Sequence, residues 1–190
     1  MQKVTMSFDE KWEQVLQCNG NYDGMFYTAV KTTKIYCRPS CRSRKPKKEN
    51  VEFYDSRDEA KDAGYRACKR CQPDAPFSPQ LTLISTVFDY FHKHYNQRIK
   101  LQDIANHAGV SMYYLERFFK KETRKTLNEM LEIIRIDKAA SLLKSTDKTN
   151  LEICYEAGFQ SPSNFYKSFR KVKGFTPSDY RKRFQETTLQ

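Results

Sequence analysis

The sequence predicts a small α+β domain followed by an all-α domain that contains two helix-turn-helix units. Three observations support this fold class. The chain has 190 residues and no single apolar stretch long enough to favour one large core. Runs of β-branched and aromatic residues occur only before residue 76, and beyond it apolar residues recur at helical intervals. We therefore expect two domains, residues 1–76 and residues 77–190.

The first domain is predicted to combine two short helices with a small sheet. Ser7 to Glu10 has the pattern of a capping box, and Asn19-Gly20 is expected to end the helix that it starts. A second capping box at residues 56–59 opens a helix that Gly64 should end. Strands are expected between these helices, at residues 25–30, 35–36 and 51–54.

A linker is expected at residues 74–79. This segment contains Pro76 and Pro79 and has little periodicity. Ser78 is expected to cap the following helix, with Pro79 in its first turn. The predicted domain boundary lies at this linker.

In the second domain one pattern occurs twice. Helix, tight turn and helix are predicted around Gly109 and again around Gly158, with small residues at Ala105 and Cys154 where paired helices meet. Cys154 is therefore predicted to be a buried packing residue. A longer helix starting at Thr126 is expected to separate the two units, with one apolar stripe from Leu127 to Leu142.

The charge balance indicates a polyanionic partner. The chain carries 34 Lys and Arg against 23 Asp and Glu, a net charge of +11. Its mean hydropathy is −0.83, and no run approaches the roughly 18 apolar residues of a membrane helix. The first residues do not have the apolar core of a secretory signal. We therefore expect a cytoplasmic protein with no membrane contact.

Four of the six cysteines form two close pairs, Cys37 with Cys41 and Cys68 with Cys71. Two such pairs match a tetrahedral site for one zinc ion with four cysteine ligands, although the first spacing does not fit a generic zinc ribbon. The site could serve only to fold a domain with a modest core. Alternatively, an exposed zinc-bound thiolate remains a usable nucleophile, so a chemical role is also open.

The residues around these cysteines carry a family resemblance. FYTAVKTTKIYCRPSCRSR, ENVEFY and GYRACKRCQPD resemble the N-terminal methyl-acceptor domain of the Ada family. Residues 81–184 resemble the AraC-type DNA-binding domain, on a GFxSxSxFxxxF pattern at residues 158–169 and a GxTPxxYR pattern at residues 174–181. The PCHR motif of the O6-methylguanine methyltransferase domain does not occur in this sequence.

The resemblance implies a methyltransferase that acts once. Cys37 is expected to accept the methyl group of a methylphosphotriester in DNA irreversibly, with Cys41, Cys68 and Cys71 as the other zinc ligands. The methylated protein is then expected to activate transcription in an adaptive response to alkylation. Four thiolates around zinc carry a formal charge of −2, and methylation makes it −1. DNA affinity should then rise, because repulsion of phosphate falls by roughly 1 to 3 kcal/mol.

The expected partner is double-stranded DNA, both DNA with a methylated backbone and promoter sites. RNA polymerase is a second expected partner. The protein is expected to act as a monomer. Thr33 and Arg44 fall at positions that the family uses near the acceptor. Basic side chains around the cysteines are expected to hold phosphates: Arg38, Arg42, Arg44, Arg66, Lys69 and Arg70. The exposed faces of the recognition helices supply the other candidates: Met112, Tyr113, Glu116, Arg117, Lys120, Ser163, Asn164, Lys167, Arg170 and Lys171.

An alternative function remains open from the sequence. The protein would then be an AraC-type transcription regulator whose zinc site is purely structural or docks polymerase. A rise in DNA affinity after alkylation distinguishes the two functions, because a purely structural site leaves that affinity unchanged.

Overall fold

The computed structural model describes residues 6–187 and, of the side chains, those up to Phe184. It divides into two compact units, Met1–Thr82 and Leu83–Gln190. The division falls in the first turn of a helix, α3 (Pro79–His94), a few residues beyond the boundary predicted at residue 76. Leu81 N–H bonds to the Ser78 hydroxyl, which confirms the predicted cap. Among the described residues, no helix is long and apolar enough to cross a membrane.

The first unit contains a four-stranded sheet with the strand order β3-β1-β2-β4. The strands are β1 (Tyr27–Val30), β2 (Ile35–Cys37), β3 (Val51–Tyr54) and β4 (Arg66–Ala67). β1 pairs antiparallel with β2 and β3, whereas β4 pairs parallel with β2. The sequence predicted the first three strands, and the two-residue β4 was not predicted.

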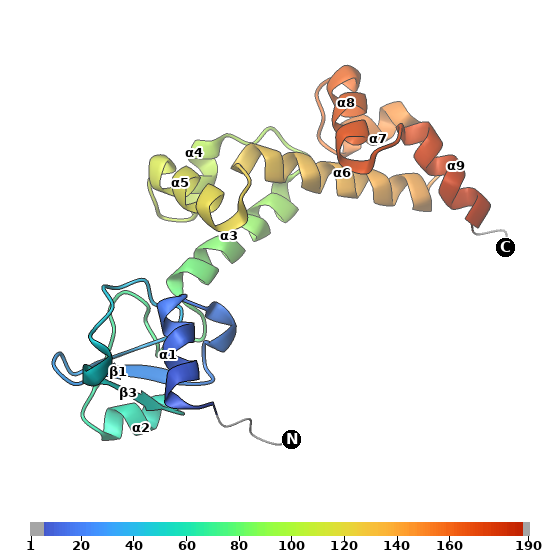
Figure 1. The fold of residues 1–190 in the computed structure, drawn as a ribbon. Coiled ribbons are helices and arrows are strands. Elements are labelled where there is room, and N and C mark those ends of the chain that lie inside the picture. The colour runs from blue at the N-terminus through green and yellow to red at the C-terminus, as the bar shows by residue number, and fades with distance from the viewer. Residues whose placement is uncertain (1–5, 188–190) are drawn as a thin grey trace. The chain divides into compact units, whose positions relative to one another are not determined.

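Helices α1 (Phe8–Leu16) and α2 (Arg57–Asp62) pack on the strands of this sheet (Figure 1). On one face the Phe8 ring of α1 meets Phe53 of β3 at 5.0 Å between ring centroids. Successive residues of a strand point to opposite sides, so Tyr27 and Ala29 lie on the other face of the sheet. Ala60 of α2 packs there in one cluster with Tyr27, Ala29 and Tyr36. Two single-turn 3₁₀ helices, η1 (Gly20–Tyr22) and η2 (Lys48–Asn50), complete the unit.

The ends of these helices differ in part from expectation. Ser7 and Glu10 form the predicted capping box of α1. The left-handed residue after α1 is Cys18, with φ of 52°, and not Gly20 as the glycine pattern had suggested. Ser56 caps α2 as predicted, but the Glu59 carboxylate accepts from the N–H of Asp55 instead of from Ser56.

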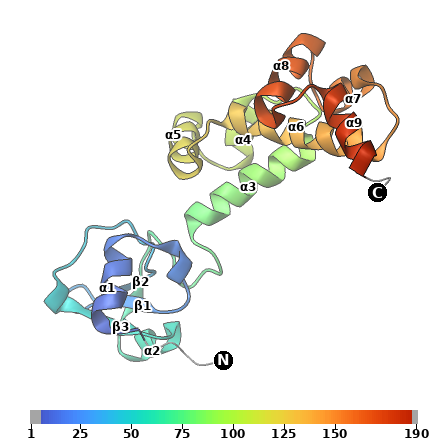
Figure 2. The ribbon, with the colours of Figure 1, turned by 45° about the vertical axis from the view of Figure 1, so that its right-hand side comes forward.

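All helices and strands in the described part of the second unit are α-helices, as predicted. It contains α4 (Leu101–His107), α5 (Met112–Thr123), α6 (Leu127–Ser145), α7 (Asn150–Glu156), α8 (Pro162–Lys173) and α9 (Pro177–Thr187). α4–α5 and α7–α8 are the two helix-turn-helix units, and α6 runs between them (Figure 2).

α6 supplies side chains to two separate apolar clusters. Its first half, with Leu131 and Ile134, packs with α3, α4 and α5. Its second half, with Ile136 and Leu143, packs with α7 and α8. The prediction of one apolar stripe was therefore wrong, because the buried side changes along the helix as its partners change. Cys154 is fully buried in the second cluster, which confirms its predicted packing role.

Candidate metal centre and nucleic-acid interface

The short strand β4 brings the two cysteine pairs together. Its parallel register aligns Tyr36 with Ala67, so Cys37 and Cys68 follow at the ends of neighbouring strands. The N–H of Cys68 bonds to the carbonyl of Tyr36 at 3.0 Å, which holds this alignment. Cys41 and Cys71 lie in the turns that come next. All four residues are buried, and their sulfur atoms lie within 4.8 Å of one another.

This donor set fits a zinc ion. Tetrahedral zinc with Zn–S bonds of about 2.3 Å needs four sulfurs packed this closely. Hydrogen bonds with Cys41 and Cys71 raise the pKa of Cys37, whereas the bond with Cys37 lowers the pKa of Cys41. Without a metal ion, some of the four thiols therefore stay protonated at neutral pH. A bound divalent cation would keep all four deprotonated.

The four sulfurs differ in their hydrogen bonds to groups outside the cluster. The backbone N–H of Arg38 donates to Cys71 Sγ at 3.4 Å, and Cys41 Sγ is hydrogen-bonded to Ser43 Oγ at 3.3 Å. Within residues 6–187, Cys37 and Cys68 receive no such bond. A hydrogen bond stabilises the charged thiolate and so makes it less reactive. We therefore expect Cys37 and Cys68 to be the two more nucleophilic sulfurs.

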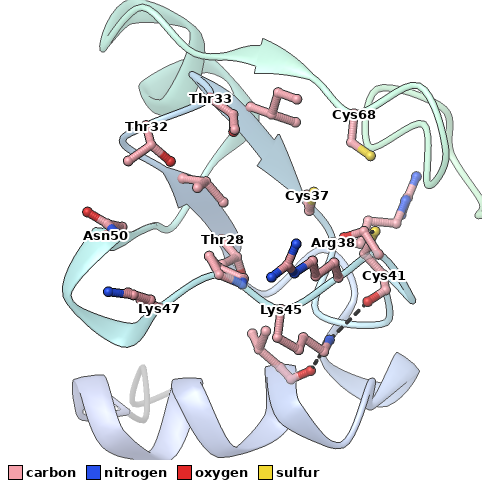
Figure 3. A pocket seen from close by; sticks show the side chains of 16 residues that line it. Thr28, Thr32, Thr33, Cys37, Arg38, Cys41, Lys45, Lys47, Asn50 and Cys68 are labelled. Atoms are coloured by element: carbon pink, nitrogen blue, oxygen red, sulfur yellow. Dashed lines mark hydrogen bonds between the residues drawn. The ribbon is translucent and has the colours of Figure 1, made fainter.

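A cavity of about 570 Å³ lies beside the cluster, and Cys37, Cys41 and Cys68 line it (Figure 3). Val15, Val30 and Ile35 give it apolar walls. Polar and basic side chains also line it: Thr28, Thr32, Thr33, Arg38, Ser43, Arg44, Lys45, Lys47 and Asn50. The walls of the cavity therefore contain both potential nucleophiles and groups that bind anions.

Most of the basic residues predicted around the cysteines are exposed, as a phosphate contact requires. They are Arg42, Arg44, Arg66, Lys69 and Arg70, and the predicted Thr33 is exposed as well. Thr33 and Arg44 line the cavity, and Arg70 donates to the carbonyl of Arg42 at 3.1 Å. Their contacts with DNA remain predictions.

Arg38 differs from this expectation. It is only 4% exposed, and its guanidinium donates to the carbonyls of Cys71, Gln72, Pro73 and Ala75. These bonds hold the segment after the second cysteine pair against the first pair. Because it is buried and its Nε and Nη2 atoms donate inside the protein, we leave Arg38 out of the proposed phosphate contacts.

Lys45 and Lys47 also line the cavity but were not among the predicted site residues. The ammonium group of Lys45 is hydrogen-bonded to the carbonyls of Val15 and Cys41 and lies 3.2 Å from Cys18 Sγ, so it joins α1 to the first cysteine loop. Both residues could have been predicted from the basic run KPKK at residues 45–48, which follows the first cysteine pair.

In the second unit, the predicted recognition residues lie on α5 and α8. All ten are exposed: Met112, Tyr113, Glu116, Arg117, Lys120, Ser163, Asn164, Lys167, Arg170 and Lys171. Three of them already have protein contacts, since Arg117 donates to the Tyr113 hydroxyl at 3.1 Å and Lys171 lies 3.5 Å from the Glu132 carboxylate. Exposure on the second helix of each unit is what base contact requires, and the contacts themselves remain predictions.

Comparisons with known proteins agree with this geometry. Residues 10–74 match the metal-binding domain of Ada, and residues 104–183 match a helix-turn-helix domain. The crystal structure of the methylated N-Ada/DNA complex is 38% identical, with a TM-score of 0.50, over 67% of this chain and 96% of that one.

Two curated relatives match along nearly the whole chain. The bifunctional transcriptional activator/DNA repair enzyme Ada of Escherichia coli is 34% identical over 95% of this chain, which spans about half (51%) of that protein. The bifunctional transcriptional activator/DNA repair enzyme AdaA of Bacillus subtilis is 34% identical over 93% of this chain and 83% of its own length. The chain therefore belongs to the family of AdaA and Ada, with the metal-binding domain of Ada ahead of a helix-turn-helix domain.

Proposed function

We propose that the protein repairs methylphosphotriesters in DNA by transferring the methyl group irreversibly to Cys37, so that each molecule reacts once. We also propose that the methylated protein activates transcription in an adaptive response to alkylation. The observation that carries this function is a buried cluster of four thiols at a cavity that basic side chains line. The relatives' names, which join DNA repair to transcriptional activation, support both parts.

The reaction is a displacement at carbon. Cys37 Sγ attacks the methyl carbon, the new S–C bond forms as the C–O bond breaks, and the electron pair stays on the phosphate oxygen. The triester thereby becomes an ordinary phosphodiester, and Cys37 becomes a thioether. Zinc held by Cys37, Cys41, Cys68 and Cys71 would keep the attacking sulfur deprotonated at neutral pH.

Two properties support Cys37 as the acceptor. It lines the cavity, and it is one of the two sulfurs without a hydrogen bond from outside the cluster among the described residues. Cys68 shares both properties, and the resemblance to the Ada methyl-acceptor domain is what selects Cys37. The thioether bond does not reverse under physiological conditions, which limits the protein to one turnover.

Methyl transfer also changes the charge of the DNA-facing surface. When the thiolate of Cys37 becomes a neutral thioether, one negative charge disappears from beside the cavity. A charge about 5 Å from a phosphate contributes roughly 1 to 3 kcal/mol at effective dielectrics between water and a protein surface. Binding to DNA should then strengthen by about fivefold to a hundredfold.

The other proposed properties follow from this function. Double-stranded DNA is the partner of both units, RNA polymerase is the partner in activation, and the protein works as a monomer in the cytoplasm. Two reading heads on one chain can contact successive major-groove segments about 34 Å apart, so a single molecule can occupy a promoter site without dimer symmetry.

Methylation of one cysteine tests the proposed repair activity. Zinc-loaded protein is incubated with a duplex that contains a methylphosphotriester, and the cysteine peptides are analysed by mass spectrometry. We expect one methyl group on Cys37 per chain. Cys154→Ala is the matched control, because Ala105 fills the equivalent position of the first unit, and it should react like the parent protein. Unmethylated Cys37 in protein with a full complement of zinc would refute the repair function.

DNA binding before and after methylation separates the proposal from the alternative of a purely structural zinc site. Affinity for a promoter duplex is measured at one fixed salt concentration, because phosphate contacts make binding strongly salt-dependent. The proposal expects a fivefold to hundredfold rise. Equal affinity in both states supports the structural alternative. Cys37→Ser must be compared at equal zinc content, because loss of the metal would mimic loss of the chemistry.

A further inference from the structure

The cavity beside Cys37 contains one unexplained polar group, the hydroxyl of Thr28. Thr28 is only 3% exposed and lines the cavity. Its Oγ1 atom is buried and forms no hydrogen bond within the described structure. A buried hydroxyl without a partner costs about 1 to 3 kcal/mol, and valine would fill the same space in a strand without that cost. A hydrogen-bond acceptor that arrives from outside the protein would remove this cost.

The sheet places this hydroxyl next to the methyl acceptor. Thr28 of β1 is directly opposite Cys37 of β2, so both side chains lie on the same face of the sheet. Its neighbour on the other side is Phe53 of β3, and Phe26 and Val30 flank it along β1. These three side chains have no acceptor, and the Cys37 sulfur is not hydrogen-bonded to Thr28 Oγ1. Figure 3 shows Thr28 and Cys37 among the residues that line the cavity.

We propose that the Thr28 hydroxyl donates a hydrogen bond to the phosphoryl oxygen of the methylphosphotriester while Cys37 attacks the methyl carbon. This inference rests on the proposed function and adds a substrate contact to it. The phosphoryl oxygen lies three bonds from the methyl carbon, through the ester oxygen and the phosphorus. Thr28 lines the same cavity as Cys37 and is its cross-strand partner, so a triester whose methyl carbon reaches the Cys37 sulfur can place this oxygen beside Thr28.

The contact acts mainly in the transition state. As the C–O bond breaks, its electron pair passes to the phosphate group, and the negative charge is shared with the phosphoryl oxygen. A fixed donor at that oxygen is worth more as the charge develops. A neutral hydroxyl also suits a substrate that is neutral before it reacts, since it adds no net charge to the cavity.

Two methyl donors test this role. The rate of Cys37 methylation is measured with a methylphosphotriester duplex and with methyl iodide, which has no phosphoryl oxygen. We expect Thr28→Val to slow transfer from the triester by about tenfold to a hundredfold and to leave the reaction with methyl iodide unchanged. Thr28→Ser keeps the hydroxyl and should stay within a few-fold of the parent protein with both donors.

Three results would overturn the inference, and they point to different causes. Equal rates for Thr28→Val and the parent protein with the triester would show that the hydroxyl does not contact the substrate. A similar slowing with both donors would show that Thr28 acts on the fold or on the sulfur. A parent protein that methyl iodide methylates at Cys37 but the triester does not would refute the proposed function itself.

Zinc content and the thermal midpoint are measured for each variant, so that a folding defect is recognised. Thr28→Val should keep one zinc per chain and be at least as stable as the parent protein, because it removes an unpaired buried hydroxyl. If Thr28→Val loses zinc, Thr28→Ala replaces it in the comparison of the triester with methyl iodide. The inference is then tested by the same three results.

Discussion

The side chains at the centre of the first unit are tyrosine rings and four cysteines, whereas those at the centre of the second are aliphatic and phenylalanine side chains in two clusters. A sheet whose strands have two to four residues buries little apolar area, so a metal ion must contribute much of the folding free energy of the first unit. The second unit has no such cluster of metal-binding residues in the part that the structure describes, and packing of its two clusters is its main source of stability. One chain thus combines a unit whose centre can hold a metal ion with a unit whose centre is apolar.

Removal of zinc is the strongest test of this difference. Structural zinc with thiolate ligands supplies on the order of 10 kcal/mol of folding free energy. We expect a chelator at neutral pH to unfold the first unit and to leave the helices of the second folded. Hydrogen exchange, followed peptide by peptide, measures both units in one experiment. Exchange that stays slow around β1 and β2 without metal would contradict the comparison.

Substitution of Gly158 tests the packing of the second unit. A Cβ at this position would lie 2.4 Å from the carbonyl oxygen of Tyr95, and the residue has φ of +88°. Gly158→Ala should therefore lower the unfolding free energy of the second unit by about 3 kcal/mol. Denaturant unfolding, monitored by circular dichroism, measures the change, and the zinc content should remain the same.

Gly109 is the matched control in the first helix-turn-helix unit. It also has a positive φ, +66°, but a Cβ there would meet nothing within 4 Å. Gly109→Ala should cost only about 1 kcal/mol, which is the backbone strain alone. Equal losses for the two variants would show that the contact with Tyr95 does not matter.

The capping boxes of the second unit predict a smaller, pH-dependent effect. Hydrogen bonds from the Thr149 side chain and backbone lower the pKa of Glu152 below its usual 4.5. A carboxyl whose folded pKa is lowered stabilises the protein above pH 4.5, and this contribution disappears as the pH falls through the folded pKa. Glu152→Gln should therefore lower the thermal midpoint slightly at pH 7 and by less at pH 3. The same difference at both pH values would argue against a charged cap.

The sequence predicted the elements that have strong local signals. Capping residues such as Ser7, Ser78 and Thr126 mark helix starts because their side chains bond to the backbone a few residues later. The four metal ligands were predicted for a similar reason, since each pair is close in sequence and its residue type has few other uses.

What could not be predicted depends on contacts between distant residues. β4 has two residues and exists only because β2 lies beside it. The position of Arg38 depends on carbonyls more than thirty residues later in the chain, at Cys71 and beyond. Thr28 belongs to a predicted strand, but only the register between β1 and β2 places it opposite Cys37.

The anchoring of the chain by Arg38 has a practical consequence for dissecting the protein. A fragment that stops at Cys71 would contain every metal ligand, yet it would remove the carbonyls of Gln72, Pro73 and Ala75 and leave a buried guanidinium short of acceptors. A fragment extended through residue 76 would keep them. The C-terminal limit of the smallest stable metal-binding fragment is therefore set by an arginine, and not by the last cysteine.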